Sequence, residues 1–111
     1  MSKSARNKGN QYERDIAEEM RQLGFEKCQT SRYASKALDD AKVDLTETDP
    51  FNIQCKAWKA APSYHKVLDE MPKDVNYNLI FHKKPYKGEV VVMKKEDFYE
   101  LLQMLIIHGV L

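Results

Sequence analysis

The chain has little cysteine, little glycine and no long hydrophobic run, and each shortage excludes a class of protein. Its two cysteines form no Cys-x-x-Cys pair and have no histidine at zinc-ligand spacing, so neither a structural zinc site nor a disulfide framework is expected. Its four glycines form no phosphate-binding loop. The longest apolar run, residues 104–107, is far too short to cross a membrane, and the polar N-terminus does not resemble a signal peptide. We expect a cytoplasmic protein with both cysteines reduced and buried.

Length and composition predict one folded domain. With 111 residues, 42% of them hydrophobic and 32% charged, the chain can bury a single core and is not disordered. The net charge of +1 gives no indication for or against nucleic acid, but residues 1–8 carry three cations and no acid. We expect a flexible basic arm at residues 1–8 and a single domain at residues 9–111. A locally basic face is sufficient for phosphate contacts, although an ordinary mixture of solvated charges explains the pattern equally well.

Periodicity and turn residues predict an α/β domain. Apolar residues recur every three or four positions from Tyr12 to Leu23, which predicts a helix over residues 9–23 that ends at Gly24. A last helix is expected from Lys95 by the same criterion. Strands are expected at residues 25–30, 43–46, 53–58, 76–82 and 89–93, with a basic polar loop at 31–36 and a short helix at 62–71. This order predicts a central mixed β-sheet flanked by helices.

The most informative stretch is residues 43–58, which predicts two short strands joined by a turn. Residues 53–58 alternate apolar and polar side chains, as is typical of a half-buried strand with Gln54 and Lys56 on one face. If the two strands pair as a hairpin, Asp44 comes onto the same face. A carboxylate, an amide oxygen and an ammonium group would then lie together, a combination suited to a divalent metal and a phosphate. The alternative is an ordinary hairpin that exposes an aspartate and a lysine.

These residues resemble the motif of the PD-(D/E)xK nuclease superfamily, which has a restriction-endonuclease-like fold. The motif elements are Glu13 on a helix, Asp44 within Val-Asp-Leu, and a Gln-x-Lys tripeptide that begins ten residues later. Within the superfamily, K-G-N-Q-Y-E-R-D at residues 8–15 and L-G-F at residues 23–25 are similar to archaeal-type Holliday junction resolvases. The resemblance covers about residues 8–58. The positions that carry it are Lys8, Gly9, Glu13, Arg14, Gly24 and Phe25 and, in outline, the serines Ser31 and Ser35.

The resemblance implies a metal-dependent DNA endonuclease that hydrolyses phosphodiester bonds in branched DNA. It implies Mg²⁺, or Mn²⁺ in its place, with Asp44 as the main ligand and with Glu13 and the Gln54 side-chain oxygen beside it. In this arrangement the Cys55 carbonyl would complete the protein ligands. Lys56 would stabilise charge on the scissile phosphate or orient the attacking water. A homodimer would place two active sites across a four-way junction. Candidate contacts to the DNA backbone are Lys8, Arg32, Ser35, Lys36 and Lys59.

Gln54 departs from the superfamily pattern, in which an acid usually precedes x-Lys. Glutamine keeps an oxygen but removes one negative charge, so weaker metal binding is expected. Two alternatives therefore stay open. One is a catalytically inactive nuclease-fold module that binds nucleic acid or a protein partner, and the other is a nuclease that acts on ordinary duplex DNA.

The remaining conspicuous side chains are given structural roles. His65 and His82 are isolated histidines, for which we expect surface or core positions rather than a role as general bases. Trp58 and the tyrosines are expected to pack rather than to stack on bases. The apolar tail at residues 106–111 either packs into the core or forms a subunit interface, and the interface is favoured.

Overall fold

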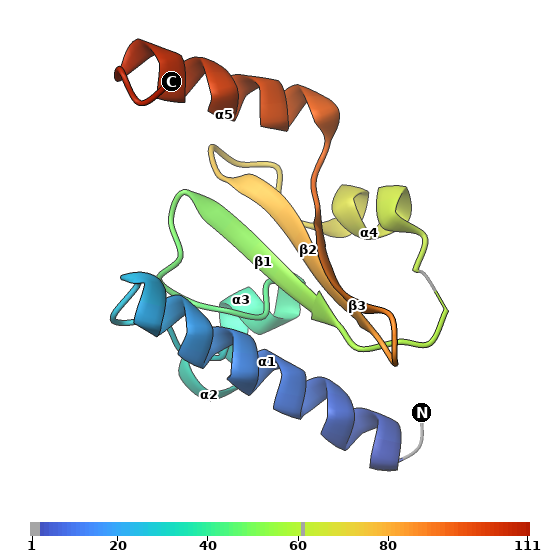
Figure 1. The fold of residues 1–111 in the computed structure, drawn as a ribbon. Coiled ribbons are helices and arrows are strands. Elements are labelled where there is room, and N and C mark those ends of the chain that lie inside the picture. Colours follow the sequence, from blue (N-terminus) through green and yellow to red (C-terminus); the bar gives the residue numbers. More distant parts are fainter. Residues whose placement is uncertain (1–2, 61) are drawn as a thin grey trace.

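A small mixed sheet with helices around it forms the structure, a computed structural model that describes residues 3–60 and 62–111 (Figure 1). The predicted α/β architecture with a mixed sheet and flanking helices is confirmed at this level. The elements in chain order are α1 (Lys3–Leu23), α2 (Ser31–Ala34), α3 (Lys36–Asp40), β1 (Phe51–Lys56), α4 (Tyr64–Glu70), β2 (Tyr77–Lys84), β3 (Gly88–Val92) and α5 (Lys95–Ile107).

The three strands lie in the order β1-β2-β3. β1 pairs with β2 in parallel, and β2 pairs with β3 in antiparallel fashion. A parallel pair needs a crossover connection, which here contains α4, whereas β2 and β3 are joined by a tight turn. The parallel pairing places the C-terminal ends of β1 and β2 at the same end of the sheet.

Helix α1 packs its apolar stripe against the sheet, and this contact forms the larger of two core clusters (Figure 1). A smaller cluster of Leu68, Met71 and Ile80 lies between α4 and β2. Cys28 and Cys55 are free and buried, as predicted. The larger cluster consists of Tyr12, Ile16, Ala17, Met20, Cys28, Leu45, Ile53, Cys55 and Leu79.

β1 is buried on both faces, so the prediction of a half-buried strand is wrong. Its apolar residues Ile53 and Cys55 face the larger core, but Asn52 and Gln54 are buried as well. The Asn52 side-chain amide donates hydrogen bonds to Asp74 and Asn78, which satisfies it. Period-2 alternation therefore separates the two faces of β1 correctly but does not identify one of them as solvent-exposed.

The strands predicted at residues 25–30 and 43–46 are not formed. A single antiparallel bridge between Thr30 and Leu45 is what joins the two segments as β-structure. Residues 25–28 instead make a tight turn after the helix, and the predicted loop 31–36 contains α2 and the start of α3. Lys42 and Glu47 have φ of 68° and 57°, so the backbone turns away on both sides of residues 43–46. The segment is too short for a ladder.

Helix α1 begins at Lys3 rather than at Gly9, so residues 3–8 of the predicted flexible arm are helical. Residues 1 and 2 lie outside the described residues. The first turns of α1 are exposed and polar. They carry no apolar stripe, which is why periodicity predicted only the packed part of the helix.

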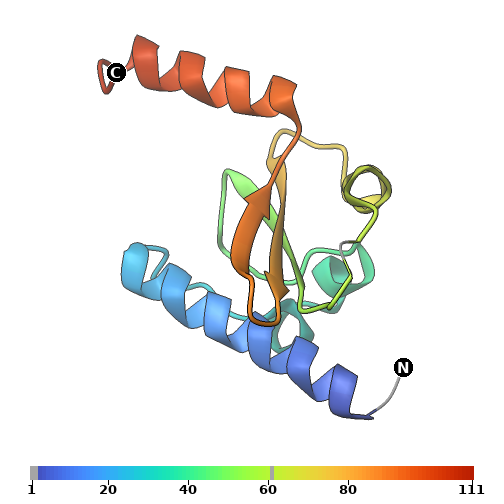
Figure 2. The ribbon, with the colours of Figure 1, turned by 45° about the vertical axis from the view of Figure 1, so that its right-hand side comes forward.

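Helix α5 stands off the sheet in both views of the fold (Figures 1 and 2). None of its residues is buried, and the Tyr77 hydroxyl donates to Met104 Sδ at 3.3 Å as one of its few contacts with the sheet. The tail at residues 108–111 is exposed too, so this region does not pack into the core. Among the described residues, no helix combines the length and the apolar character needed to cross a membrane.

Candidate active site

A pocket of about 300 Å³ at the C-terminal end of β1 brings together all four residues predicted as catalytic. α1, α2, the segment before β1 and β1 itself all contribute to its walls. Its lining residues are Ala5, Arg6, Gly9, Asn10, Glu13, Arg32, Asp44, Gln54, Cys55, Lys56, Ala57 and Trp58.

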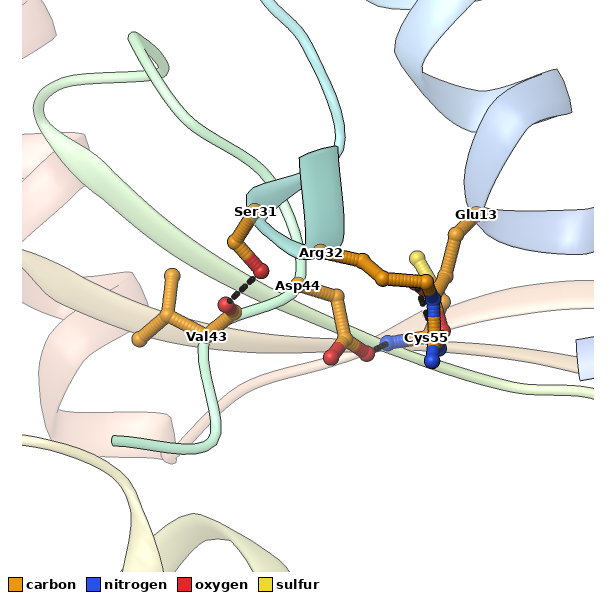
Figure 3. Close-up of polar contacts among 6 residues, drawn as sticks. All are labelled: Glu13, Ser31, Arg32, Val43, Asp44 and Cys55. Atoms are coloured by element: carbon orange, nitrogen blue, oxygen red, sulfur yellow. Dashed lines mark hydrogen bonds and ion pairs between the residues drawn. The ribbon is translucent and has the colours of Figure 1, made fainter. Parts of the chain in front are cut away.

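Asp44 is held against the free edge of β1 although the predicted hairpin is absent. Its backbone N–H donates to the Ile53 carbonyl at 2.8 Å, and its carboxylate Oδ2 accepts from the Cys55 N–H at 2.7 Å (Figure 3). Ser31 fixes the segment from the other side, because its Oγ donates to the Val43 carbonyl at 2.6 Å and its N–H donates to the Asp44 carbonyl at 2.8 Å. These contacts leave Asp44 Oδ1 for a cation.

Glu13 projects from the buried side of α1 and is only 6% exposed. Arg32 Nη2 donates to both of its carboxylate oxygens, at 2.9 and 3.2 Å (Figure 3). Burial, followed by the nearby charge of Asp44, raises the pKa of Glu13 to about 7 even though Arg32 acts in the opposite direction.

The pKa of Asp44 is also raised by burial, while the Cys55 N–H and the Lys56 ammonium favour its charged form. Two carboxyl groups with raised pKa values thus share one pocket. Such a pair is stabilised when a positive charge is added between them. A divalent cation supplies two positive charges, so neither carboxyl group has to take up a proton.

Gln54 provides the observation that tests whether a metal fits. The Gln54 side chain is buried, and its Oε1 accepts no hydrogen bond from any described residue. An unsatisfied buried oxygen costs about 1–3 kcal/mol, so this atom lacks a donor or a cation. The Cys55 carbonyl points to the same edge of β1 as the Cys55 N–H, which is the edge where Asp44 lies.

The donor set suits a hard cation that keeps part of its water shell. In the described parts of the chain, no group of three or more His, Cys, Asp or Glu side chains is arranged to hold a metal. Mg²⁺ is typically bound by one or two carboxylates plus waters, and oxygen is the donor it prefers. Glu13 and Asp44, with the Gln54 and Cys55 oxygens, therefore fit Mg²⁺ or Mn²⁺ and not a thiolate-type zinc site.

Lys56 and Trp58 form the outer rim of the pocket. The Lys56 ammonium lies 4.5 Å from the centroid of the Trp58 ring, and this ring is 42% exposed. The prediction that Trp58 is packed is therefore only half right. Buried His82 anchors this segment, because its Nε2 lies 3.0 Å from the Trp58 carbonyl and its Nδ1 lies 2.8 Å from the Tyr64 hydroxyl. A carbonyl only accepts, so Nε2 carries the proton, and His82 has the structural role expected of it.

The predicted DNA-binding residues do not all gather at the pocket. Arg32 lines it, but through its ion pair with Glu13. Lys36 is paired with Asp40 at 3.2 Å, and the Ser35 hydroxyl accepts from Leu38 N–H as the cap of α3. Both are thereby engaged in α3. Lys8 and Lys59 are exposed near the pocket without lining it.

Sequence reasoning missed Arg6 and Asn10, which line the pocket from α1. Arg6 lies two helical turns before Glu13 and thus on the same face of the helix. Extending the helix into the basic segment at residues 3–8 would have predicted this position.

We predict that the Glu13 carboxyl titrates with a midpoint of about 7 in ¹³C NMR spectra. Asp44→Asn should lower the midpoint, because it removes a negative charge, and Arg32→Gln should raise it, because it removes a positive one. The raised pKa means that the folded state binds this proton more tightly than the unfolded state. The contribution of Glu13 to stability is therefore full below pH 4.5 and is lost as the pH rises through about 7.

Comparison with Glu13→Gln isolates that loss. Relative to this variant, the wild-type free energy of unfolding should fall by on the order of 3 kcal/mol between pH 4.5 and pH 8. A wild-type midpoint near 4.5, or parallel stability curves for the two proteins, would contradict the prediction.

A second prediction concerns Gln54→Leu, which removes the unsatisfied oxygen at nearly constant volume. In EDTA the variant should be more stable than the wild type by about 1–2 kcal/mol. In excess Mg²⁺ this difference in stability should become smaller or change sign, because bound Mg²⁺ stabilises only a protein that retains the metal site. Thermal unfolding under both conditions measures this, and the exposed Gln22→Leu on α1 serves as the control. Equal Mg²⁺ shifts in all three proteins would exclude Gln54 as a ligand.

The pocket therefore combines a buried carboxyl group, a half-buried carboxyl group, an unsatisfied amide oxygen, an ammonium group and two arginines. Comparison of the chain with protein-family models, with curated proteins and with solved structures gave no match. The function has to be inferred from the geometry of this pocket.

Proposed function

We propose that this protein is a metal-dependent DNA endonuclease that hydrolyses phosphodiester bonds in branched DNA, with a fold of the restriction-endonuclease type. The observation that carries the proposal is the convergence of Glu13, Asp44, Gln54 and Lys56 in one pocket from three separate parts of the chain. Acids and a lysine at this spacing are suited to a metal ion and a phosphate, and the two arginines in the same pocket favour an anionic substrate.

Each residue has a role that follows from its environment. Asp44 Oδ1, the Glu13 carboxylate, the Gln54 amide oxygen and the Cys55 carbonyl would hold the cation. When bound, Mg²⁺ or Mn²⁺ lowers the pKa of a water ligand and neutralises phosphate charge. The Lys56 ammonium is placed to stabilise the charge that develops on the scissile phosphate.

Arg32 would exchange partners during this process. In the structure it forms an ion pair with Glu13, and its side chain is half exposed at the pocket. A cation at the carboxylates would release Arg32 for a bidentate contact with a phosphate. Arg6 lies on the same wall of the pocket and offers a second contact of this kind.

The topology supports the proposed fold type without depending on ideal strands. A long helix packs on a sheet, and an aspartate segment is hydrogen-bonded to the free edge of β1. A helical crossover then leads to a parallel neighbouring strand. The segment around Gln29 lies beside this aspartate segment. The Thr46 N–H donates to the Gln29 carbonyl, and the Gln29 N–H donates to Thr46 Oγ1, so the two segments before β1 extend the sheet by short contacts.

A homodimer is part of the proposal, since symmetric cleavage of a junction needs two active sites. Helix α5 and the tail supply a surface for a second copy. Seven large apolar side chains of this region are at least 42% exposed, as is typical of a surface that another protein chain covers. The exposed apolar residues are Phe98, Tyr99, Met104, Ile106, Ile107, Val110 and Leu111.

The second candidate is a catalytically inactive module of the same fold that binds nucleic acid or a protein. The absence of an acid at Gln54 favours it, because a site with two carboxylates binds a metal less tightly than a site with three. The two candidates make opposite predictions in a cleavage assay.

The third prediction is metal-dependent cleavage of a labelled four-way junction that is lost in Asp44→Asn. The variant keeps an acceptor for the Cys55 N–H but loses the charge, so a fall in rate of at least about 100-fold is expected with little change in stability. Asp40→Asn, an exposed change on α3, is the control and should cleave normally.

A linear duplex of matched sequence and an EDTA sample complete that experiment. Cleavage of both substrates would keep the nuclease and discard the preference for branched DNA. A folded wild-type protein that cuts neither substrate with Mg²⁺ or Mn²⁺ would favour the inactive module.

The fourth prediction is that the wild type is a dimer and that Ile106→Glu with Ile107→Glu is a folded monomer. Charge on the exposed apolar surface would oppose association while leaving the core unchanged. Light scattering after gel filtration measures the mass, and Gln103→Glu on the same helix is the control. A wild type that stays monomeric at about 100 μM would refute the proposed interface.

A further inference from the structure

The turn between β2 and β3 projects from the sheet with an unusual composition. We call residues Lys84–Lys87 the hairpin tip; it reads Lys-Pro-Tyr-Lys. The Lys87 N–H donates to the Lys84 carbonyl at 3.1 Å, which closes the turn. All of its side chains are exposed, and the Tyr86 ring is as accessible as in an extended chain.

The hairpin tip lies at the end of the sheet where β1 ends (Figures 1 and 2), and the active-site pocket is lined by the last residues of β1. β1 and β2 are parallel, and Lys56 at the end of β1 pairs with His82, two residues before the tip. Ala57 lines both the active-site pocket and a neighbouring pocket of about 290 Å³. Pro85 of the tip and Lys8 of α1 line that second pocket. A ligand that fills the first pocket and extends past Ala57 therefore reaches the tip.

The charge of the tip is available for a ligand. The ion pairs among the described side chains involve Arg32, Lys36 and Lys94, and none involves the tip. Lys83, just before the tip, is opposite the acid Glu89 in the β2–β3 ladder, so its charge is partly balanced. Among the described residues, Lys84 and Lys87 remain as two unpaired cations. They lie at the end of the sheet where Arg6 and Lys8 line the two pockets.

Tyr86 is held in a conformation that favours other residues. Its φ is 63°, in the left-handed region where Gly, Asn and Asp are usual and a bulky side chain is strained. Its fully exposed ring makes no packing contact that would explain an aromatic residue there. An exposed aromatic ring between two cations is typical of surfaces that bind unpaired bases, where the ring stacks and the cations contact phosphates.

We propose that the hairpin tip is a second DNA-binding element, in which Lys84 and Lys87 contact phosphates and Tyr86 stacks on a base that is unstacked at the branch point next to the cleavage site. The inference rests on the proposed function and names the part of the substrate that the tip recognises. That part is DNA with an unstacked base at the branch point, within reach of the pocket.

The lysines are tested by DNA binding in EDTA, so that cleavage plays no part. Lys84→Ala with Lys87→Ala should raise the Kd for a fluorescent four-way junction about tenfold. It should also make the negative slope of log K against log salt less steep by about 2, one unit for each phosphate contact. Lys27→Ala with Lys95→Ala makes the same change in net charge away from the tip and should leave the slope unchanged. Equal effects of the two double variants would overturn the assignment.

Tyr86 is tested by comparing a junction with a linear duplex. Tyr86→Ala should weaken binding to the junction about tenfold and leave binding to the duplex within twofold, whereas Tyr86→Trp should retain both. Equal losses on the two substrates, or no loss on either, would overturn the stacking role. Vesicles with phosphatidylserine form a further arm, and binding to them that depends on Lys84 and Lys87 without any effect on DNA would overturn the assignment to nucleic acid.

The tip proposal and the proposed nuclease activity can be refuted independently in these assays. If the wild type cuts the junction while the tip variants bind it normally, the tip proposal is wrong and the proposed function stands. If the wild type cuts nothing but the tip variants lose junction affinity, the tip is correct and the protein is a binding module. Circular dichroism and thermal unfolding verify that each variant is folded.

Discussion

The hydrogen bond from the Cys55 N–H to Asp44 Oδ2 is the contact on which the candidate site depends. It joins the loop segment before β1 to the free edge of the strand and fixes the carboxylate against that edge. The buried Ser31 hydroxyl holds the same segment through the Val43 carbonyl. With the segment fixed in this way, α1 has only to pack its apolar stripe on the sheet for Glu13 to reach the same pocket.

The placement of buried Glu13 beside half-buried Asp44 provides the chemistry of the pocket and also lowers the stability of the free protein. Burial raises the pKa values of both Glu13 and Asp44, and the charge of Asp44 raises the pKa of Glu13 further. Arg32 and Lys56 compensate in part. The unsatisfied Gln54 oxygen adds to the cost. Groups that disfavour the free protein in this way are the groups that a cation would satisfy, which is the physical basis of the metal proposal.

The candidate site was more predictable than the segments that carry it. Asp44, Gln54 and Lys56 were predicted to meet on a hairpin, with Glu13 on a helix. All four do line one pocket, but the hairpin is absent. Period-2 alternation detected β1, whose ladder is long enough to impose that period. Strands were wrongly predicted at residues 25–30 and 43–46. A tight turn and flanking residues with left-handed backbone limit the pairing of these segments to a single bridge. Local apolar content does not distinguish a strand from a short extended segment.

The sequence by itself determined the α/β class, the buried stripe of α1, the strands β1 to β3 and the residue types of the candidate site, because periodicity and turn chemistry are local properties. Only the tertiary structure decided that Glu13 is buried beside Asp44, that Arg32 is paired with Glu13, and that β1 is covered on both faces. It also brought the hairpin tip to the end of the sheet where the pocket lies. These relations depend on packing between segments distant in sequence, and no local pattern records which side chains such packing removes from water.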